Sequence, residues 1–170
     1  HNVGGPLSVS DPRIKLDLLE TFMDAAEEKG IPKVNDFNTG DNFGCGYFQV
    51  TEKNGLRCSA AVGYLNPIKN RKNLKIEINC HVKKINFEGK KAVSVSYWKD
   101  DKLFTVIANK EIILSAGSIG TPQILQTSGI GDANKLSKLG INIIKNSQNI
   151  GKNLQDHLMF RPVYKVKNIK

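Results

Sequence analysis

The N-terminal part of the chain contains a pattern typical of an amphipathic helix. In "SDPRIKLDLLETFMDAAEEKGIP" we expect Asp11 to cap the helix, Pro12 to occupy its first position and Gly30 to end it. The apolar residues that recur at the spacing of one helix face are Ile14, Leu18, Phe22 and Ala25.

The next segment is dense in Asn, Asp and Gly, in "NDFNTGDNFGCGYFQVTEKNGLR", which is typical of a loop. Within it "YFQVT" predicts a short strand, because β-branched and aromatic residues are enriched in strands. After it, "CSAAVGYLNP" predicts a short helix that Pro67 ends.

From residue 73 onward the apolar period changes to two, which predicts strands. "NLKIEINCHV" reads as one strand, and the apolar face then changes near Lys83 and Lys84, so we expect a bend or bulge there. "EGKK" and "KDDK" are turn signals around "AVSVSYW", followed by "LFTVIA". The pattern therefore predicts a small antiparallel β-meander over about residues 82 to 108.

The segment after the meander reads as strand, glycine turn and helix. "EIIL" is apolar without alternation, as expected of a strand buried on both faces of a parallel sheet. In "GSIGTPQILQTSGIG", Ser118 or Thr121 can cap a helix and Pro122 can occupy its first turn. Such a turn presents free N–H groups to an anion, although glycines that serve only a tight crossover would give the same pattern. The fold class expected is α/β with mixed α+β character.

Composition and charge describe a globular chain with a basic surface. Of the 170 residues 39% are hydrophobic, and the net charge is +9. The basic residues are scattered, and only "KNRKNLK" is dense, which favours a solvated lysine-rich surface over a nucleic-acid interface. Three cysteines without CxxC spacing indicate neither a disulfide framework nor a zinc site, and no apolar run is long enough to span a membrane.

The ends of the sequence suggest part of a larger protein. It begins with "HNVGG", without Met or a signal peptide, and it stops in the strand-like alternation of "VYKVKNIK". No G-x-G-x-x-G fingerprint is present, because Gln49 stands where "GCG" at residues 44–46 would need a third glycine.

Three motifs together resemble the glucose-methanol-choline (GMC) family of FAD-dependent oxidoreductases. "GSIGTPQILQTSGIG" agrees with that family's second signature at each constrained position. "NGLRCSAAVGYLNPIKNRKNLKI" resembles its R-x-S-A-A-x-x-Y-L-x-P segment followed by R-x-N-L, and "IGKNLQDHL" resembles its V-G-x-N-L-Q-D-H block. The resemblance begins near Gly5, continues to the last residues, and is strongest to the bacterial choline and alcohol dehydrogenase branch.

The resemblance implies a division of the chain into parts of two domains. Residues 1–50 would belong to a substrate domain that caps the flavin. Residues 51–150 would form part of a Rossmann-like FAD-binding domain whose parallel sheet is interrupted by the β-meander. Residues 151–170 would begin the return to the substrate domain.

The resemblance also implies where FAD binds. Val82 sits where the family places a valine whose backbone hydrogen-bonds the adenine, and its alternative is an ordinary core valine. Ser115, Ala116 and Gly117 would line the AMP and ribose side of the cofactor. The motif that contains His157 runs near the flavin, but a loop histidine bonded to its neighbours is the favoured interpretation. No metal site and no catalytic residue are expected in this chain, since the family's catalytic histidine lies downstream.

The activity implied is oxidation of the CH–OH group of an alcohol, choline or another primary alcohol. A histidine outside this chain would take the hydroxyl proton while hydride passes to flavin N5. The electron acceptor stays open between oxygen, a quinone and another compound, and no nucleic-acid partner is expected. We expect a cytoplasmic location, with peripheral contact at the inner membrane as an alternative. Two other hypotheses are a different two-dinucleotide flavoprotein, such as a disulfide reductase, and a basic nucleic-acid-binding module.

Overall fold

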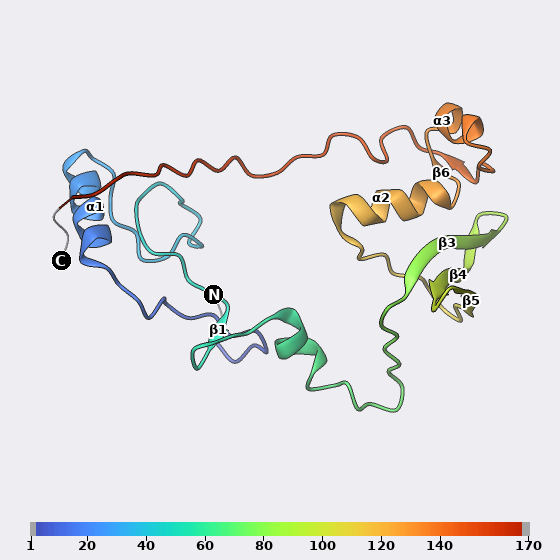
Figure 1. Cartoon of the computed structure of the whole chain (residues 1–170), viewed down its shortest axis with the longest axis horizontal. Coiled ribbons are helices and arrows are strands. Elements are labelled where there is room, and N and C mark those ends of the chain that lie inside the picture. Colours follow the sequence, from blue (N-terminus) through green and yellow to red (C-terminus); the bar gives the residue numbers. More distant parts are fainter. Residues whose placement is uncertain (1–2, 168–170) are drawn as a thin grey trace. The chain divides into compact units, whose positions relative to one another are not determined.

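The computed structural model describes residues 3–167, which form helices and small sheets in two compact units. Unit 1 is His1–Ile76 and unit 2 is Glu77–Lys170. Both are drawn in Figure 1, and each is described by itself. The chain is thus mixed helix and sheet, as the sequence predicted.

Unit 1 contains one helix of ordinary length, α1 (Asp17–Glu28). It begins later than predicted: Asp11 does not cap it, and Leu16 holds the N-cap position in an extended conformation. The reason is that Ser10 pairs with Val50 through two backbone hydrogen bonds of 3.0 and 2.9 Å, which keep the preceding chain extended. The predicted end is confirmed, because Gly30 has a φ of +83° and donates its N–H to Glu27.

The rest of unit 1 is mostly loop, with one hairpin and one helical turn. Strands β1 (Glu52–Lys53) and β2 (Leu56–Arg57) pair across an Asn-Gly turn, and the π-helical turn η1 (Ala61–Leu65) ends before Pro67 as predicted. The predicted "YFQVT" strand is wrong, since only its Val50 makes a bridge. In "GCG", Gly46 allows its backbone to pack against the backbone of Val34, because a Cβ on Gly46 would lie 2.1 Å from the carbonyl oxygen of Val34.

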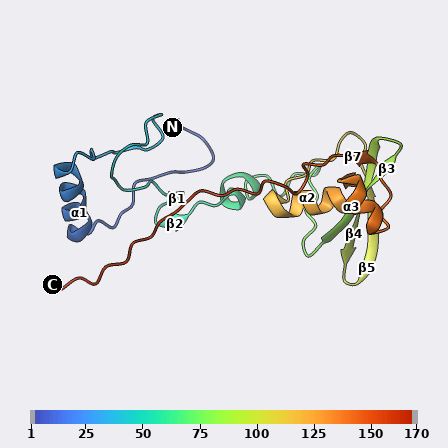
Figure 2. The same ribbon diagram turned by 90° about the horizontal axis from the view of Figure 1, so that it is seen from above.

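Unit 2 contains the predicted meander. Strands β3 (His81–Glu88), β4 (Lys91–Lys99) and β5 (Lys102–Ile107) form an antiparallel sheet in the order β3-β4-β5. The register shifts between Val82 and Lys84, which confirms the bulge expected from the change of apolar face. Figures 1 and 2 show the three strands as neighbouring arrows beside helix α2 (Gly117–Thr127), which contacts β3.

Two strands predicted on either side of the meander are wrong. Residues 73–80 of "NLKIEINCHV" are not strand, because β4 turns away at Asp100 and Asp101 and leaves no partner upstream of His81. Residues 111–114, "EIIL", form no strand either, and Ile113 is 76% exposed. A parallel strand needs neighbouring strands for its hydrogen bonds, and no described residue pairs with this segment.

The C-terminal part of unit 2 is a small α/β arrangement followed by an extended tail. Helix α3 (Ala133–Lys138) is capped by Asp132, and β6 (Ile130–Gly131) pairs in parallel with β7 (Lys145–Asn146). Residues 152–167 form neither helix nor strand, so the alternation from Val163 is not a strand there, and residues 168–170 lie outside the described range. In the described part of the chain no helix has the length and apolar character needed to cross a membrane.

Candidate functional site

Helix α2 is formed by the glycine-rich motif. Gly117 opens it with a φ of +81°, a left-handed conformation that glycine adopts without strain. The predicted caps are wrong: Ala116 holds the N-cap position without a side-chain cap, and Ser118 and Thr121 lie inside the helix, where Thr121 Oγ1 accepts a hydrogen bond of 3.1 Å from the Ala116 N–H. The helix starts five residues before Pro122, so the proline lies inside it rather than in its first turn as predicted. Gly129, with a φ of +89°, ends the helix as expected.

Two hydroxyl groups at the end of α2 fix the helix against the outer edge of β3. Ser128 Oγ accepts a hydrogen bond of 2.8 Å from the backbone N–H of Ile85, and both residues are buried. Thr127 Oγ1 lies 3.1 Å from the carbonyl oxygen of Lys83 and equally far from the carbonyl oxygens of Gln123 and Ile124 in its own helix, so its one hydroxyl proton is shared among them. β3 pairs with β4 on one side only, so these bonds satisfy backbone groups on the edge that no described strand covers. The bulge of β3 is therefore held in a defined position beside the helix.

A hollow of about 380 Å³ lies between the start of β3 and helix α2. We call it the β3–α2 hollow, and it falls within the size range of small-molecule sites. It brings together Val82 and Ala116, two of the four residues predicted to bind the cofactor, although they are far apart in the sequence. Its lining residues are Cys80, His81, Val82, Lys83, Trp98, Ala116, Gly120, Gln123, Ile124 and Thr127.

The other two predicted residues are at the rim of this region rather than in the lining. Ser115 and Gly117 flank Ala116 and are exposed. A Cβ placed on Gly117 would have no protein atom within 4 Å, so open space lies beside the backbone at this position. The positive φ thus favours glycine at position 117, and the open space beside it leaves room for a bound ligand.

The lining also contains residues that the sequence did not single out. Trp98 and Lys83 come from β4 and from the bulge of β3, and the Lys83 ammonium lies 5.2 Å from the centroid of the indole ring. Period-two alternation assigned both residues to strands but gave no sign that they share a hollow with the helix. The separation in sequence between Trp98 and α2 explains why local patterns could not find this contact.

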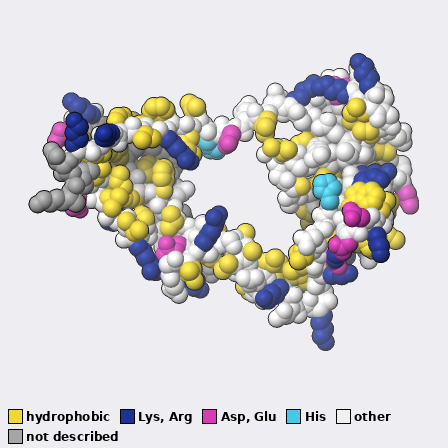
Figure 3. All heavy atoms as spheres, in the orientation of Figure 1, with side chains coloured by type: hydrophobic (Ala, Val, Ile, Leu, Met, Phe, Trp, Pro, Cys, Tyr) yellow, Lys and Arg dark blue, Asp and Glu magenta, His cyan; other side chains and the backbone are white. Residues whose placement is uncertain are grey.

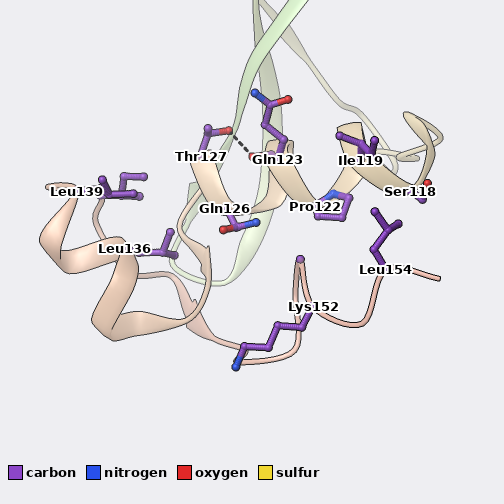
Figure 4. Close-up of a pocket in the computed structure, with 12 residues that line it drawn as sticks. Ser118, Ile119, Pro122, Gln123, Gln126, Thr127, Leu136, Leu139, Lys152 and Leu154 are labelled. Atoms are coloured by element: carbon purple, nitrogen blue, oxygen red, sulfur yellow. Dashed lines mark hydrogen bonds between the residues drawn. The ribbon is translucent and has the colours of Figure 1, made fainter.

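A second hollow, of about 440 Å³, lies on another side of α2. Figure 4 shows its lining from α2, from α3 and from the segment around Leu154, with Leu136 and Leu139 on the α3 side. A Cβ on Gly151 would lie 2.7 Å from the side-chain nitrogen of Gln126, so glycine permits the close approach of this segment to the helix. None of the predicted cofactor residues lines this hollow.

The "NLQDH" motif lies in the exposed tail. Asp156 Oδ1 accepts a hydrogen bond of 2.7 Å from the backbone N–H of His157, so the carboxylate orients its neighbour. Asn153 has a φ of +56°, which bends the chain just before the motif. His157 is thus a loop residue, as expected, but this bond is made by its backbone, so the role of its imidazole stays a prediction.

The chemistry of the β3–α2 hollow suits part of an adenine dinucleotide. The outer edge of β3 runs beside it, and backbone groups on a strand edge can hydrogen-bond an adenine ring. None of the described residues that line it is acidic, and His81 and Lys83 contribute basic groups, so phosphate would not be repelled. Together with the open space beside Gly117, these features fit an FAD of the kind that the motifs imply.

Comparison with known proteins identifies the family to which the chain belongs. The sequence model described as GMC oxidoreductase matches residues 1–159. Mitochondrial choline dehydrogenase of Homo sapiens is 42% identical over 154 residues, which are 91% of this chain and 26% of that protein. Alcohol dehydrogenase (acceptor) of Pseudomonas putida is 39% identical over 160 residues, which are 93% of this chain and 29% of that protein.

Solved structures give the same result. The crystal structure of pyridoxine 4-oxidase from Mesorbium loti superimposes with a TM-score of 0.86 and 31% identity, over 92% of this chain and 31% of that one. An FAD-dependent oxidoreductase from Chaetomium thermophilum gives a TM-score of 0.80 and 35% identity, over 84% and 25% of the two chains. The chain therefore spans about a quarter to three tenths of the length of the relatives it matches.

Proposed function

The chain belongs to the GMC oxidoreductase family, and on that premise we propose that it forms part of an FAD-dependent oxidoreductase that acts on the CH–OH group of an alcohol. The observation that carries the proposal is the β3–α2 hollow, where Val82 and Ala116 lie together beside the glycine-rich helix start. When bound, the FAD would accept hydride from the alcohol carbon. The residues of this chain would bind and orient the cofactor rather than move the proton.

Four residues of the chain would hold the adenosine side of FAD. Val82 lies on the outer strand of the sheet and would contact the adenine through its backbone. Ser115, Ala116 and Gly117 would pass along the AMP and ribose portion, since the backbone there is exposed and space is open beside Gly117. Because Ser128 and Thr127 fix α2 against β3, the two halves of this surface keep their spacing without the ligand.

The domain roles follow from the same premise. Residues 51–150 would belong to the FAD-binding domain, residues 1–50 to the substrate domain, and residues 151–170 to the connection back to it. The basis is the family resemblance, together with the position of the β3–α2 hollow in unit 2. The pyrophosphate-binding fingerprint and the catalytic histidine would come from outside the matched segment, so the 170 residues alone should bind FAD weakly and catalyse nothing.

The substrate class is argued from the relatives. Human choline dehydrogenase and the Pseudomonas putida alcohol dehydrogenase share 42% and 39% of their aligned residues with this chain, so choline or another primary alcohol is the proposed substrate. The electron acceptor stays open between oxygen, a quinone and another compound. We also propose a cytoplasmic location, with peripheral contact at the inner membrane as its alternative.

The first experiment is a flavin spectrum of the whole enzyme, expressed from the open reading frame that contains this sequence. It should show flavin absorbance that choline or another primary alcohol bleaches in the absence of oxygen. Denaturation should release FAD and not FMN. A protein that acquires no flavin absorbance when FAD is added would contradict the proposal, as would a bound flavin that no alcohol reduces.

The site is tested with a matched pair of glycine variants. Gly117 and Gly89 both have a positive φ, +81° and +59°, and a Cβ on either meets no atom within 4 Å. Changing either residue to alanine should therefore cost a similar strain, roughly 1 kcal/mol. Only Gly117→Ala should weaken FAD binding, because Gly89 lies in the β3–β4 turn. Equal FAD affinity in the two variants would remove Gly117 from the site.

A further inference from the structure

Trp98 has a position that the proposed cofactor site does not yet use. It is the only tryptophan of the chain, it lies near the end of β4, and it is 39% exposed. On the sheet it pairs with His81 of β3, and it lines the β3–α2 hollow together with Val82 and Ala116. A large aromatic side chain at this exposure leaves part of its ring available to a ligand.

Lys83 provides a positive charge at the same place. It is the residue between Val82 and Lys84 where the register of β3 shifts, and its carbonyl oxygen accepts the Thr127 hydroxyl at 3.1 Å. This bond fixes the backbone of the bulge, while the exposed side chain places its ammonium 5.2 Å from the Trp98 ring centroid. The bulge therefore presents a cation and an aromatic ring to one hollow.

A ring and a cation side by side match the two chemical parts of an adenine nucleotide. A planar base stacks on an indole ring, and such contacts tolerate any base because each has a π-face. An ammonium on a flexible stem can exchange the indole for a phosphate oxygen, since it acts as a compact point charge. The absence of acidic side chains among the described lining residues leaves this charge uncancelled within the hollow.

We propose that Trp98 and Lys83 bind the adenine nucleotide end of FAD, Trp98 by stacking on the adenine and Lys83 by pairing with a phosphate. The inference rests on the proposed function and deepens it by naming side-chain contacts beside the backbone of Val82. It assigns the adenine rather than the flavin ring to Trp98, because the strand edge that would hydrogen-bond a base borders the same hollow.

The single tryptophan allows a direct test on the 170-residue chain, titrated with ADP and FAD to concentrations high enough for the weak binding expected of it. ADP does not absorb where tryptophan emits, so it quenches Trp98 fluorescence only by contact. We expect saturable quenching by ADP and by FAD, with ADP competing against FAD, and no saturable effect of FMN, which lacks the adenine nucleotide. Saturation by FMN but not by ADP, or no saturation by ADP and FAD, would overturn the inference.

Variants then separate the two side chains. Trp98→Leu should weaken FAD binding roughly tenfold and Trp98→Phe, which keeps a ring, by less. Lys83→Gln should weaken FAD binding about twofold to fivefold and make the affinity less dependent on salt. Lys83→Arg should keep both the affinity and its dependence on salt. Lys90→Gln is the control, because Lys90 lies in the β3–β4 turn and lines no part of the hollow. The dissociation constant is measured by flavin fluorescence, with circular dichroism as the check of folding.

The outcomes distinguish this inference from the function on which it rests. A whole enzyme whose flavin is bleached by alcohol, but whose FAD affinity is unchanged by Trp98→Phe, Trp98→Leu and Lys83→Gln, would keep the function and overturn the inference. A flavoprotein that no alcohol reduces, but whose affinity falls in these variants, would keep the inference and remove the alcohol oxidoreductase.

Discussion

The two units differ in how their backbones are held together. Unit 1 has only two-residue strands and isolated bridges beside its helix α1, whereas unit 2 has a three-stranded sheet with a helix fixed to its edge. Among the residues that the structure describes, the buried polar ones, Ser94, Ser96 and Ser128, all belong to unit 2. The β3–α2 hollow lies in unit 2, between the three-stranded sheet and the helix fixed to its edge, which suits the proposal of a site whose residues must keep their spacing.

Exposed apolar side chains occur in both units, and Figure 3 shows them spread over the visible surface. Phe48 of unit 1 is 72% exposed, and Ile107 and Ile113 of unit 2 are each 76% exposed. Large exposed apolar areas are typical of surfaces that contact other polypeptide. Because the matched segment is only 26% of the human relative, further polypeptide accompanies it in that protein.

The largest expected effect is on the core of unit 2. Leu136 of α3 is 1% exposed, and Leu136→Ala should lower the free energy of unfolding of unit 2 by about 2–5 kcal/mol, because it removes buried apolar contacts and leaves a cavity. Urea unfolding followed by Trp98 fluorescence measures it, since the only tryptophan belongs to this unit.

Leu139→Ala is the control for this change, because Leu139 ends the same helix and is 72% exposed. It should alter stability by less than about 0.5 kcal/mol. Equal losses in the two variants would show that α3 does not pack as described.

The meander could be predicted from the sequence because its signals are local. "EGKK" and "KDDK" mark turns whose Gly89, Asp100 and Asp101 have positive φ, and the change of apolar face at Lys83 marks the bulge. The prediction of a strand at "EIIL" was wrong for the opposite reason. An apolar run indicates that a segment is buried, but no other described strand pairs with this segment, and Ile113 is 76% exposed. Local pattern thus predicts hairpins well and says little about partners distant in sequence.

The second prediction tests the bond that joins α2 to β3. Ser128→Ala leaves the buried N–H of Ile85 without the oxygen that accepts it at 2.8 Å. An unsatisfied buried donor should cost about 1–3 kcal/mol in the free energy of unfolding. Thermal or urea unfolding measures the loss. Ser137→Ala, at an exposed position of α3, is the matched control and should be close to neutral.

The candidate site was predicted where a motif fixes the backbone and missed where side chains converge from distant strands. The positive φ of Gly117 follows from the glycine turn, and Val82 and Ala116 do share a hollow. Trp98 and Lys83 were not identified, because their proximity to α2 depends on the Thr127 and Ser128 bonds. The cofactor roles of Val82, Ser115, Ala116 and Gly117 stay predictions.

The third prediction concerns unit 1, where fewer side chains are buried. Met23 is the buried residue of α1, at 9% exposure, and Met23→Ala should lower stability by about 1–2 kcal/mol, below most core substitutions because the surrounding packing is sparse. Hydrogen exchange of the α1 amides measures it locally. Phe22→Ala, at a residue that is 59% exposed, should leave exchange nearly unchanged. If Phe22→Ala accelerated exchange of the α1 amides more than Met23→Ala, the helix would instead bury the face that contains Phe22, as its apolar spacing suggested.

The smallest expected effect is a pH dependence that both units share. In unit 2 the Lys99 ammonium donates to Glu77 at 2.6 Å, and in unit 1 Lys33 pairs with Asp24. The hydrogen bond to the carboxylate raises the pKa of each lysine above its usual value. A raised pKa in the folded state stabilises the protein fully below the unfolded pKa of about 10.4, and this contribution is lost as the pH rises through the folded value.

Melting temperatures between neutral pH and about pH 11 check this sign. Lys99→Gln should melt slightly below the wild type near neutral pH, and the difference should shrink above the pKa of Lys99, because the wild-type lysine then also lacks its charge. Lys33→Gln should show the same pH dependence, but its effect should appear in the hydrogen exchange of the α1 amides in unit 1. A difference that grows at alkaline pH would show that the ammonium destabilises the fold. Exposed pairs contribute little because water and salt screen them, so the contrast between the units should rest on their ladders and cores.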